Sequence, residues 1–130
     1  MISKYLSDIG IKEENLPWYW NPDDPRQEYW AKDREIYGFD ERDTWALDYT
    51  MTYLIYPRLK MYNEINIINT DYHKFKYEGK QYTLQECINK ILEGFEIYIK
   101  GDLYKFSEQE IIKIKDSRML LGIIWSALWW

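Results

Sequence analysis

The sequence predicts an all-α protein, a small four-helix-type bundle with an irregular, proline-bounded N-terminal segment. One observation is a pair of capping boxes, Thr83 with Glu86 and Ser107 with Glu110, which mark two helix starts. A second is the recurrence of apolar residues three and four positions apart over long stretches. The chain has 130 residues, the usual size of one domain. We therefore expect a single helical domain over residues 1–130, with residues 1–25 packed on it.

The N-terminal segment is limited by prolines at positions 17, 22 and 25, which prevent a long helix there. A short helix is expected at residues 2–8. Between the first two prolines lie Trp18, Tyr19 and Trp20. We expect these three aromatic side chains to anchor the segment across the helical body.

The first long helix is expected over residues 26–37, because it follows a proline and Gly38 can end it. A second helix should begin at Asp40, whose carboxylate can cap it while Asp43 occupies the third position. This helix is expected to run to residue 64 and to bend at Pro57.

The helix over residues 41–64 carries two largely apolar stripes, so it should be contacted on much of its circumference and form the centre of the bundle. Trp45 and Leu54 are expected to be mostly buried. Asp48 is expected to pair with Arg34 or Arg58, because an unpaired charge among apolar neighbours is costly. The stripes are Trp45, Tyr49, Thr52, Tyr56, Leu59 and Leu47, Met51, Leu54, Arg58, Met61.

Residues 66–82 are expected to be a connector that allows a minor β-hairpin around Glu78-Gly79. The capping boxes then start helices over residues 84–100, ended by Gly101, and 108–128. Gly94 and Gly122 lie inside these helices, and close helix approach explains both. The inward faces are predicted to be Ile88, Ile91, Leu92, Phe95, Ile99 and Ile111, Ile114, Met119, Ile123, Trp125.

Composition excludes several classes of function. The net charge is −5, with 17 Lys and Arg against 22 Asp and Glu, which argues against binding duplex nucleic acid. The longest apolar stretch, residues 119–130, is too short to span a membrane, so no membrane partner is expected. Cys87 is the single cysteine and cannot form an intramolecular disulfide, which favours the reducing cytoplasm.

Residues suited to catalysis are few. His73 is the single histidine, and no other member of a nucleophilic triad is placed by the sequence. Cys87 falls on the apolar side of a helix, where a structural role is favoured. Neither zinc-ligand spacing nor a glycine-rich phosphate loop occurs. We therefore expect no enzyme activity, no metal and no cofactor.

Arginines and aromatic residues alternate between positions 30 and 58, and this segment holds the candidate site. One interpretation is an Asp–Arg network that ties the first two helices together. The other is a pocket in which arginines bind phosphate or carboxylate and an aromatic ring stacks on a base. The candidate ligand- or partner-binding residues are Trp30, Arg34, Arg42, Asp43, Trp45, Asp48 and Arg58.

Residues 38–48 read Gly-Phe-Asp-Glu-Arg-Asp-Thr-Trp-Ala-Leu-Asp, and residues 55–60 read Ile-Tyr-Pro-Arg-Leu-Lys. This block resembles a recurrent signature of small tailed-phage and prophage proteins of unassigned function, and the resemblance extends over most of residues 26–130. It implies a phage origin, and hence a location in the host cytoplasm, rather than a mechanism. Small non-catalytic phage proteins are often accessory proteins that act on host machinery or host defence.

Three binding functions follow from these observations. The first is a counter-defence sponge that sequesters a nucleotide-type immune signal. The second is an inhibitor that binds a host defence protein through its Trp- and Tyr-rich surface. The third is a virion assembly or packaging accessory protein. Self-association is also expected, because Trp125, Leu128, Trp129 and Trp130 form an apolar end that a second subunit or the Trp18–Trp20 segment could cover.

Overall fold

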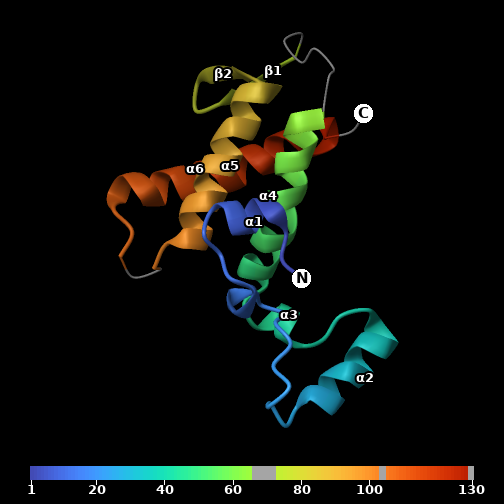
Figure 1. The fold of residues 1–130 in the computed structure, drawn as a ribbon. Coiled ribbons are helices and arrows are strands. Elements are labelled where there is room, and N and C mark those ends of the chain that lie inside the picture. The colour runs from blue at the N-terminus through green and yellow to red at the C-terminus, as the bar shows by residue number, and fades with distance from the viewer. Residues whose placement is uncertain (66–72, 103–104, 129–130) are drawn as a thin grey trace. The chain divides into compact units, whose positions relative to one another are not determined.

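The computed structural model describes residues 1–65, 73–102 and 105–128 (Figure 1). The described chain is mainly helical with one small antiparallel hairpin, so the prediction of a mainly α-helical protein is confirmed. The chain divides into two compact units, Met1–Ile55 and Tyr56–Trp130, which are described in turn. The single-domain organisation of residues 1–130 stays a prediction.

The N-terminal segment contains more regular structure than its prolines suggested. Helix α1 (Lys4–Asp8) matches the predicted short helix and begins at Ser3, whose hydroxyl accepts a hydrogen bond from the Tyr5 amide at 3.3 Å. A 3₁₀ turn, η1 (Glu13–Asn15), follows. Trp18 is half-buried and lies edge-on to Tyr53, with ring centroids 6.3 Å apart. The aromatic segment therefore does contact a helix of its own unit.

Helix α2 (Gln27–Tyr37) ends where the sequence predicts. Gly38 adopts φ 84°, a left-handed conformation that favours glycine, and its amide donates to the Arg34 carbonyl at 2.9 Å. The predicted stop is confirmed.

The predicted single helix after Gly38 is wrong, because the chain breaks at Ala46 (φ −135°, ψ 72°). Two helices result, α3 (Arg42–Trp45) and α4 (Leu47–Ile65), and α4 contains Pro57. Glu41 occupies the N-cap position of α3 and makes no side-chain cap bond. The Asp40 carboxylate nevertheless accepts from the first-turn amide of Arg42 at 3.1 Å, as predicted, and it also binds the Arg42 side chain.

The burial expected of two aromatic and aliphatic residues near this break is contradicted. Trp45 is 57% exposed and Leu54 is 40% exposed. Trp45 belongs to the short α3, where its ring lies edge to face with that of Trp30 and 5.4 Å from the Arg26 guanidinium, yet most of its surface stays exposed. Within α4 the first predicted stripe does face inward, since Thr52, Tyr56 and Leu59 are buried and Tyr49 is half-buried. The second stripe, Leu47, Met51, Leu54, Arg58 and Met61, is exposed, so that part of the prediction is wrong.

The hairpin of the second unit follows the predicted turn. Strands β1 (Lys74–Tyr77) and β2 (Lys80–Thr83) pair antiparallel, with Phe75 opposite Tyr82. Glu78 and Gly79 both have positive φ, 50° and 78°, which is typical of the two-residue turns that match strand twist. The minor hairpin is confirmed.

Helices α5 (Leu84–Lys100) and α6 (Glu108–Ile124) begin at the two capping boxes, and both boxes are confirmed. In each, the cap hydroxyl accepts from the third-position amide at 3.1 Å, and the glutamate accepts from the cap amide at 3.0 Å. A 3₁₀ turn, η2 (Trp125–Ala127), closes α6. Figure 1 shows α5 and α6 beside each other in this unit.

The two helical glycines of this unit have different surroundings. A Cβ on Gly94 would lie 2.4 Å from the Ser117 Cβ and 2.5 Å from the Lys113 carbonyl oxygen, so close approach of α5 and α6 is confirmed there. A Cβ on Gly122 would meet nothing within 4 Å, so close approach there is wrong.

The inward face of α5 is confirmed, whereas that of α6 was largely misassigned. Of the five α6 residues and neighbours predicted to face inward, only Ile114 is buried. The helix has apolar residues around its whole circumference, so periodicity could not select a face. The buried residues of α6 are Ile114, Ser117, Leu120, Leu121 and Ile124, and the exposed ones include Ile111, Met119 and Ile123, with Trp125 just beyond.

Within the described ranges, no helix is both long and apolar enough to cross a membrane.

Candidate ligand-binding site

Asp40 is the centre of the polar structure in the first unit. Its side chain is 2% exposed and receives two arginines. Arg42 binds it in a two-pronged arrangement, with Nε at 2.9 Å from Oδ1 and Nη2 at 2.8 Å from Oδ2, while Arg34 Nη1 lies 2.6 Å from Oδ2. The Arg42 hydrogen bonds, followed by the Arg34 one, lower the pKa of the Asp40 carboxyl below its usual value despite its burial.

Arg42 connects this carboxylate to two other parts of the unit. Its side chain is 8% exposed, and Nη1 donates to the carbonyl oxygen of Tyr19 in the aromatic N-terminal segment. The guanidinium also lies 4.2 Å from the centroid of the Trp30 ring. Arg42 therefore ties the N-terminal segment, α2 and α3 together, which is the structural interpretation of the Asp–Arg network.

Trp30 is the largest fully buried side chain of this unit, at 2% exposure. A second guanidinium, that of Arg26, lies 4.6 Å from its centroid and is held by Asp24. The Arg26 hydrogen bonds lower the pKa of Asp24 to about 2. The Trp30 indole donates to Glu41 at 3.3 Å, and its ring meets Trp45 edge-on at 5.9 Å. The arginines around Trp30 are thus engaged in holding the unit together.

A pocket of about 370 Å³ opens beside this network, and we name it the Asp43 pocket. Aromatic rings of the N-terminal segment and of the α2–α3 turn supply walls, and the Asp40 network supplies one side. It is lined by Trp18, Trp20, Arg34, Gly38, Phe39, Asp40, Arg42, Asp43 and Leu54.

The two carboxylates of the pocket are in opposite electrostatic situations. Asp40 has arginine partners, whereas Oδ1 of Asp43 is buried with no hydrogen-bond partner among the described residues. Burial, followed by the nearby Asp40 charge, raises the pKa of the Asp43 carboxyl. A buried acceptor without a donor is costly, and a ligand that donates an N–H or O–H would relieve that cost.

The structure brings together three of the seven candidate site residues, since Arg34, Arg42 and Asp43 line the Asp43 pocket. Trp30 lies against Arg42, and the exposed Trp45 lies against Trp30; neither lines the pocket. Asp48 is exposed in α4, and Arg34 pairs with Asp40. Arg58 belongs to the second unit and is not among the pocket residues.

Sequence reasoning missed four lining residues that carry the character of the pocket. Trp18 and Trp20 were assigned only an anchoring role, and Phe39 and Asp40 were part of the arginine- and aromatic-rich segment without being candidate binding residues. The Asp40-Glu41-Arg42 order was a usable signal, because Asp two positions before Arg can bind both its amide and its side chain, as Asp24 also does with Arg26.

The residues considered for catalysis or metal binding are dispersed. His73 is exposed, and Cys87 is fully buried, where burial raises the pKa of its thiol. Among the described residues, no group of three or more His, Cys, Asp or Glu side chains is arranged to hold a metal ion.

Comparison with protein-family models, with curated proteins and with solved structures found no match for this chain, so its resemblance to phage proteins stays a prediction.

Proposed function

We propose that the protein is a non-catalytic binding protein that holds a small nucleotide-type ligand in the Asp43 pocket. The observation that carries this proposal is that Asp43, whose buried Oδ1 has no hydrogen-bond partner among the described residues, lines a pocket together with Trp18, Trp20 and Phe39. A nucleobase offers a flat ring that stacks on aromatic side chains and edge N–H groups that donate to a carboxylate.

The arginines have different roles in this proposal. Arg42 is buried and committed to Asp40 and Tyr19, so it positions the pocket. The Arg34 side chain is 36% exposed and uses Nη1 for Asp40, while its guanidinium lies 5.8 Å from the Trp20 ring. A guanidinium has five N–H donors, so we assign Arg34 the role of binding a phosphate of the ligand.

The biological setting of the proposal rests on the resemblance of residues 38–60 to small phage proteins. A phage protein that binds a nucleotide without converting it would act as a sponge for a host immune signal in the host cytoplasm. The protein then removes the signal by binding it stoichiometrically rather than by converting it. This mode of action needs neither enzyme activity nor a cofactor, in agreement with the sequence-based expectation.

A direct inhibitor of a host defence protein is the second candidate function. Its support is the exposed apolar surface of the first unit, where Tyr29 is 55%, Ile36 70%, Tyr37 64% and Trp45 57% exposed. Tyrosine and tryptophan are enriched in the energetically dominant parts of protein interfaces.

Self-association and the four-helix-type arrangement are further parts of the proposal. Trp125 is 61% exposed and supports a second subunit at the C-terminal end, whereas Trp129 and Trp130 lie outside the described residues. Light scattering at micromolar concentration should report a dimer or larger species, and a monomeric mass would count against it. Small-angle scattering should give the compact envelope of a bundle.

The experiment that tests the ligand is calorimetric titration with a panel of mononucleotides, cyclic dinucleotides and ADP-ribose, beside native mass spectrometry of the protein from infected cells. We expect one member to bind and to be released intact on heat denaturation. Trp20→Ala and Arg34→Ala should each weaken binding about tenfold or more, since each removes a stacking or gripping group.

Trp45→Ala is the matched control, because it removes an exposed tryptophan of the same unit that does not line the pocket. Ligand binding should survive it. If instead the panel gives no heat, and a host protein co-purifies in equal amount and is lost with Trp45→Ala, the direct inhibitor replaces the sponge.

A further inference from the structure

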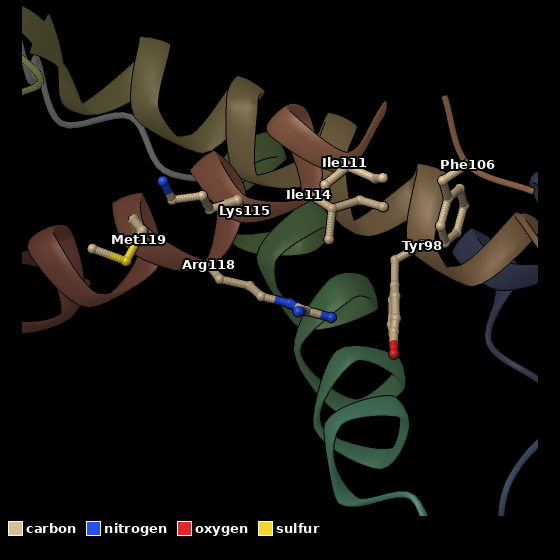
Figure 2. A pocket seen from close by; sticks show the side chains of 7 residues that line it. All are labelled: Tyr98, Phe106, Ile111, Ile114, Lys115, Arg118 and Met119. Atoms are coloured by element: carbon tan, nitrogen blue, oxygen red, sulfur yellow. The ribbon is translucent and has the colours of Figure 1, made fainter. Parts of the chain in front are cut away.

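The second unit has a pocket of its own, with a volume of about 330 Å³. Its residues come from α5, from the turn before α6 and from the outer side of α6. We name it the Tyr98 pocket; it is lined by Tyr98, Phe106, Ile111, Ile114, Lys115, Arg118 and Met119 (Figure 2). All seven residues lie in the unit Tyr56–Trp130, so this pocket is independent of the Asp43 pocket.

The body of the Tyr98 pocket is apolar. Tyr98 and Phe106 lie side by side, with ring centroids 6.3 Å apart, and Ile114 continues the surface from α6. Ile111 and Met119 are 54% and 50% exposed at its edge. These residues are the ones that sequence periodicity assigned to the core, and their exposure leaves apolar surface available to a ligand.

Among the described residues, the charged side chains that line this pocket are Lys115 and Arg118, both cations. The guanidinium of Arg118 lies 4.6 Å from the centroid of the Tyr98 ring. Figure 2 shows Arg118 extending from α6 toward Tyr98. In a chain of net charge −5, the described lining of this hollow combines an apolar surface with two cationic side chains.

We propose that the Tyr98 pocket binds a small amphipathic monocarboxylate. The apolar chain or ring of the ligand packs on Tyr98, Phe106 and Ile114, and its carboxylate pairs with Arg118, with Lys115 adding positive potential at the rim. Planar guanidinium and carboxylate groups match in geometry, and such charge-assisted pairs are the strong ones. A volume of about 330 Å³ is near the lower end for small-molecule sites, which limits the ligand to a medium-length chain or a single ring system.

The test uses octanoate and two molecules of the same chain length, 1-octanol and octyltrimethylammonium, titrated into the full chain and followed by amide chemical shifts. Octanoate should bind once per chain, with shifts at Tyr98, Ile114 and Arg118. 1-Octanol should bind at least about tenfold more weakly than octanoate, and octyltrimethylammonium should not bind. The reason is that only the carboxylate can pair with Arg118.

Arg118→Met tests the charge while keeping an unbranched apolar side chain on the exposed face. It should weaken octanoate binding about tenfold and leave octanol binding unchanged. Lys113→Met is the matched control, since Lys113 lies on the same helix, pairs with Glu93 and does not line the pocket. Lys115→Met provides a second, independent removal of positive charge and should cause a smaller loss.

Equal affinity for octanoate and octanol would overturn the proposal, and this comparison needs no variant. Shifts that map away from α5 and α6 would overturn it as well. So would octanoate binding that Arg118→Met and Lys115→Met both leave intact.

Discussion

The two units of this protein are stabilised in different ways. In the first, Asp40, Arg42 and Trp30 form a buried polar and aromatic centre that joins segments from Tyr19 to α3. In the second, α5 and α6 begin at local capping boxes and meet through apolar residues and the close contact of Gly94 with Ser117. The first unit therefore depends on a few charged groups, whereas the second spreads its stability over many apolar contacts.

This difference has an energetic consequence. A buried ion pair adds little net stability, but removing one partner leaves a desolvated charge and is strongly destabilising. Apolar packing responds to substitution in proportion to the volume changed. Single substitutions should therefore have their largest effects in the first unit and graded effects in the second.

The sharpest way to break the first unit is Asp40→Ala, which strands the buried guanidinium of Arg42. We expect a loss of about 3–5 kcal/mol in the free energy of unfolding, measured by urea denaturation with tryptophan fluorescence. Asp24→Ala is the matched control, because it removes the carboxylate of an Asp-x-Arg pair whose arginine is exposed. Its effect should be much smaller, and equal effects would mean that Asp40 is not the centre of the unit.

In the second unit the largest effect is expected from Gly94→Ala. The new Cβ would meet Ser117 and the Lys113 carbonyl at 2.4–2.5 Å, so the helices must separate. The cost of overpacking outweighs the gain in helix propensity, and we expect a net loss of about 2 kcal/mol. A Cβ added at Gly122 meets nothing within 4 Å, so Gly122→Ala should increase the free energy of unfolding by up to about 1 kcal/mol and raise the melting temperature. A stabilising Gly94→Ala would contradict the observed helix contact.

The capping boxes should give intermediate effects in this unit. Thr83→Ala and Ser107→Ala each remove a hydroxyl that accepts from a first-turn amide, so each should lower stability by about 1 kcal/mol. The exposed Ser126→Ala serves as the control. Unchanged denaturation midpoints for both cap variants would mean that the caps contribute nothing measurable.

The smallest effect is expected at Asp43 and should depend on pH. Because the folded state raises the pKa of this carboxyl, Asp43 lowers stability as pH rises through that raised pKa. Asp43→Asn should therefore stabilise the protein by under about 1 kcal/mol at pH 7 and make little difference near pH 3. Urea midpoints at the two pH values measure this, and a variant that is less stable at pH 7 would show that the ionised carboxylate is satisfied. The pH dependence contributed by Asp40 has the opposite sign. Because folding lowers the pKa of its carboxyl, Asp40 adds stability that is lost as pH falls through that lowered pKa.

Much of the second unit could be predicted because its signals are local. The Glu78-Gly79 turn, the caps at Thr83 and Ser107, and the inward face of α5 each depend on residues a few positions apart. The outer face of α6 could not be predicted, since a helix with apolar residues on every side gives periodicity nothing to choose between. Two of the residues that periodicity misassigned to the core, Ile111 and Met119, are exposed and line the Tyr98 pocket.

From the order of residues alone one could predict that the chain is mainly helical, where α2 ends, where α5 and α6 begin, and that a segment rich in arginine and aromatic residues accompanies them. It took the folded arrangement to show that Asp40 binds both Arg34 and Arg42, and that Trp18 and Trp20, rather than Trp45, line the Asp43 pocket. Caps and turns are decided by hydrogen bonds between near neighbours, so their residues can be read in order. The partners of a buried charged side chain depend on which groups the tertiary structure brings within hydrogen-bonding distance. Arg42, for example, donates to the carbonyl oxygen of a residue 23 positions away.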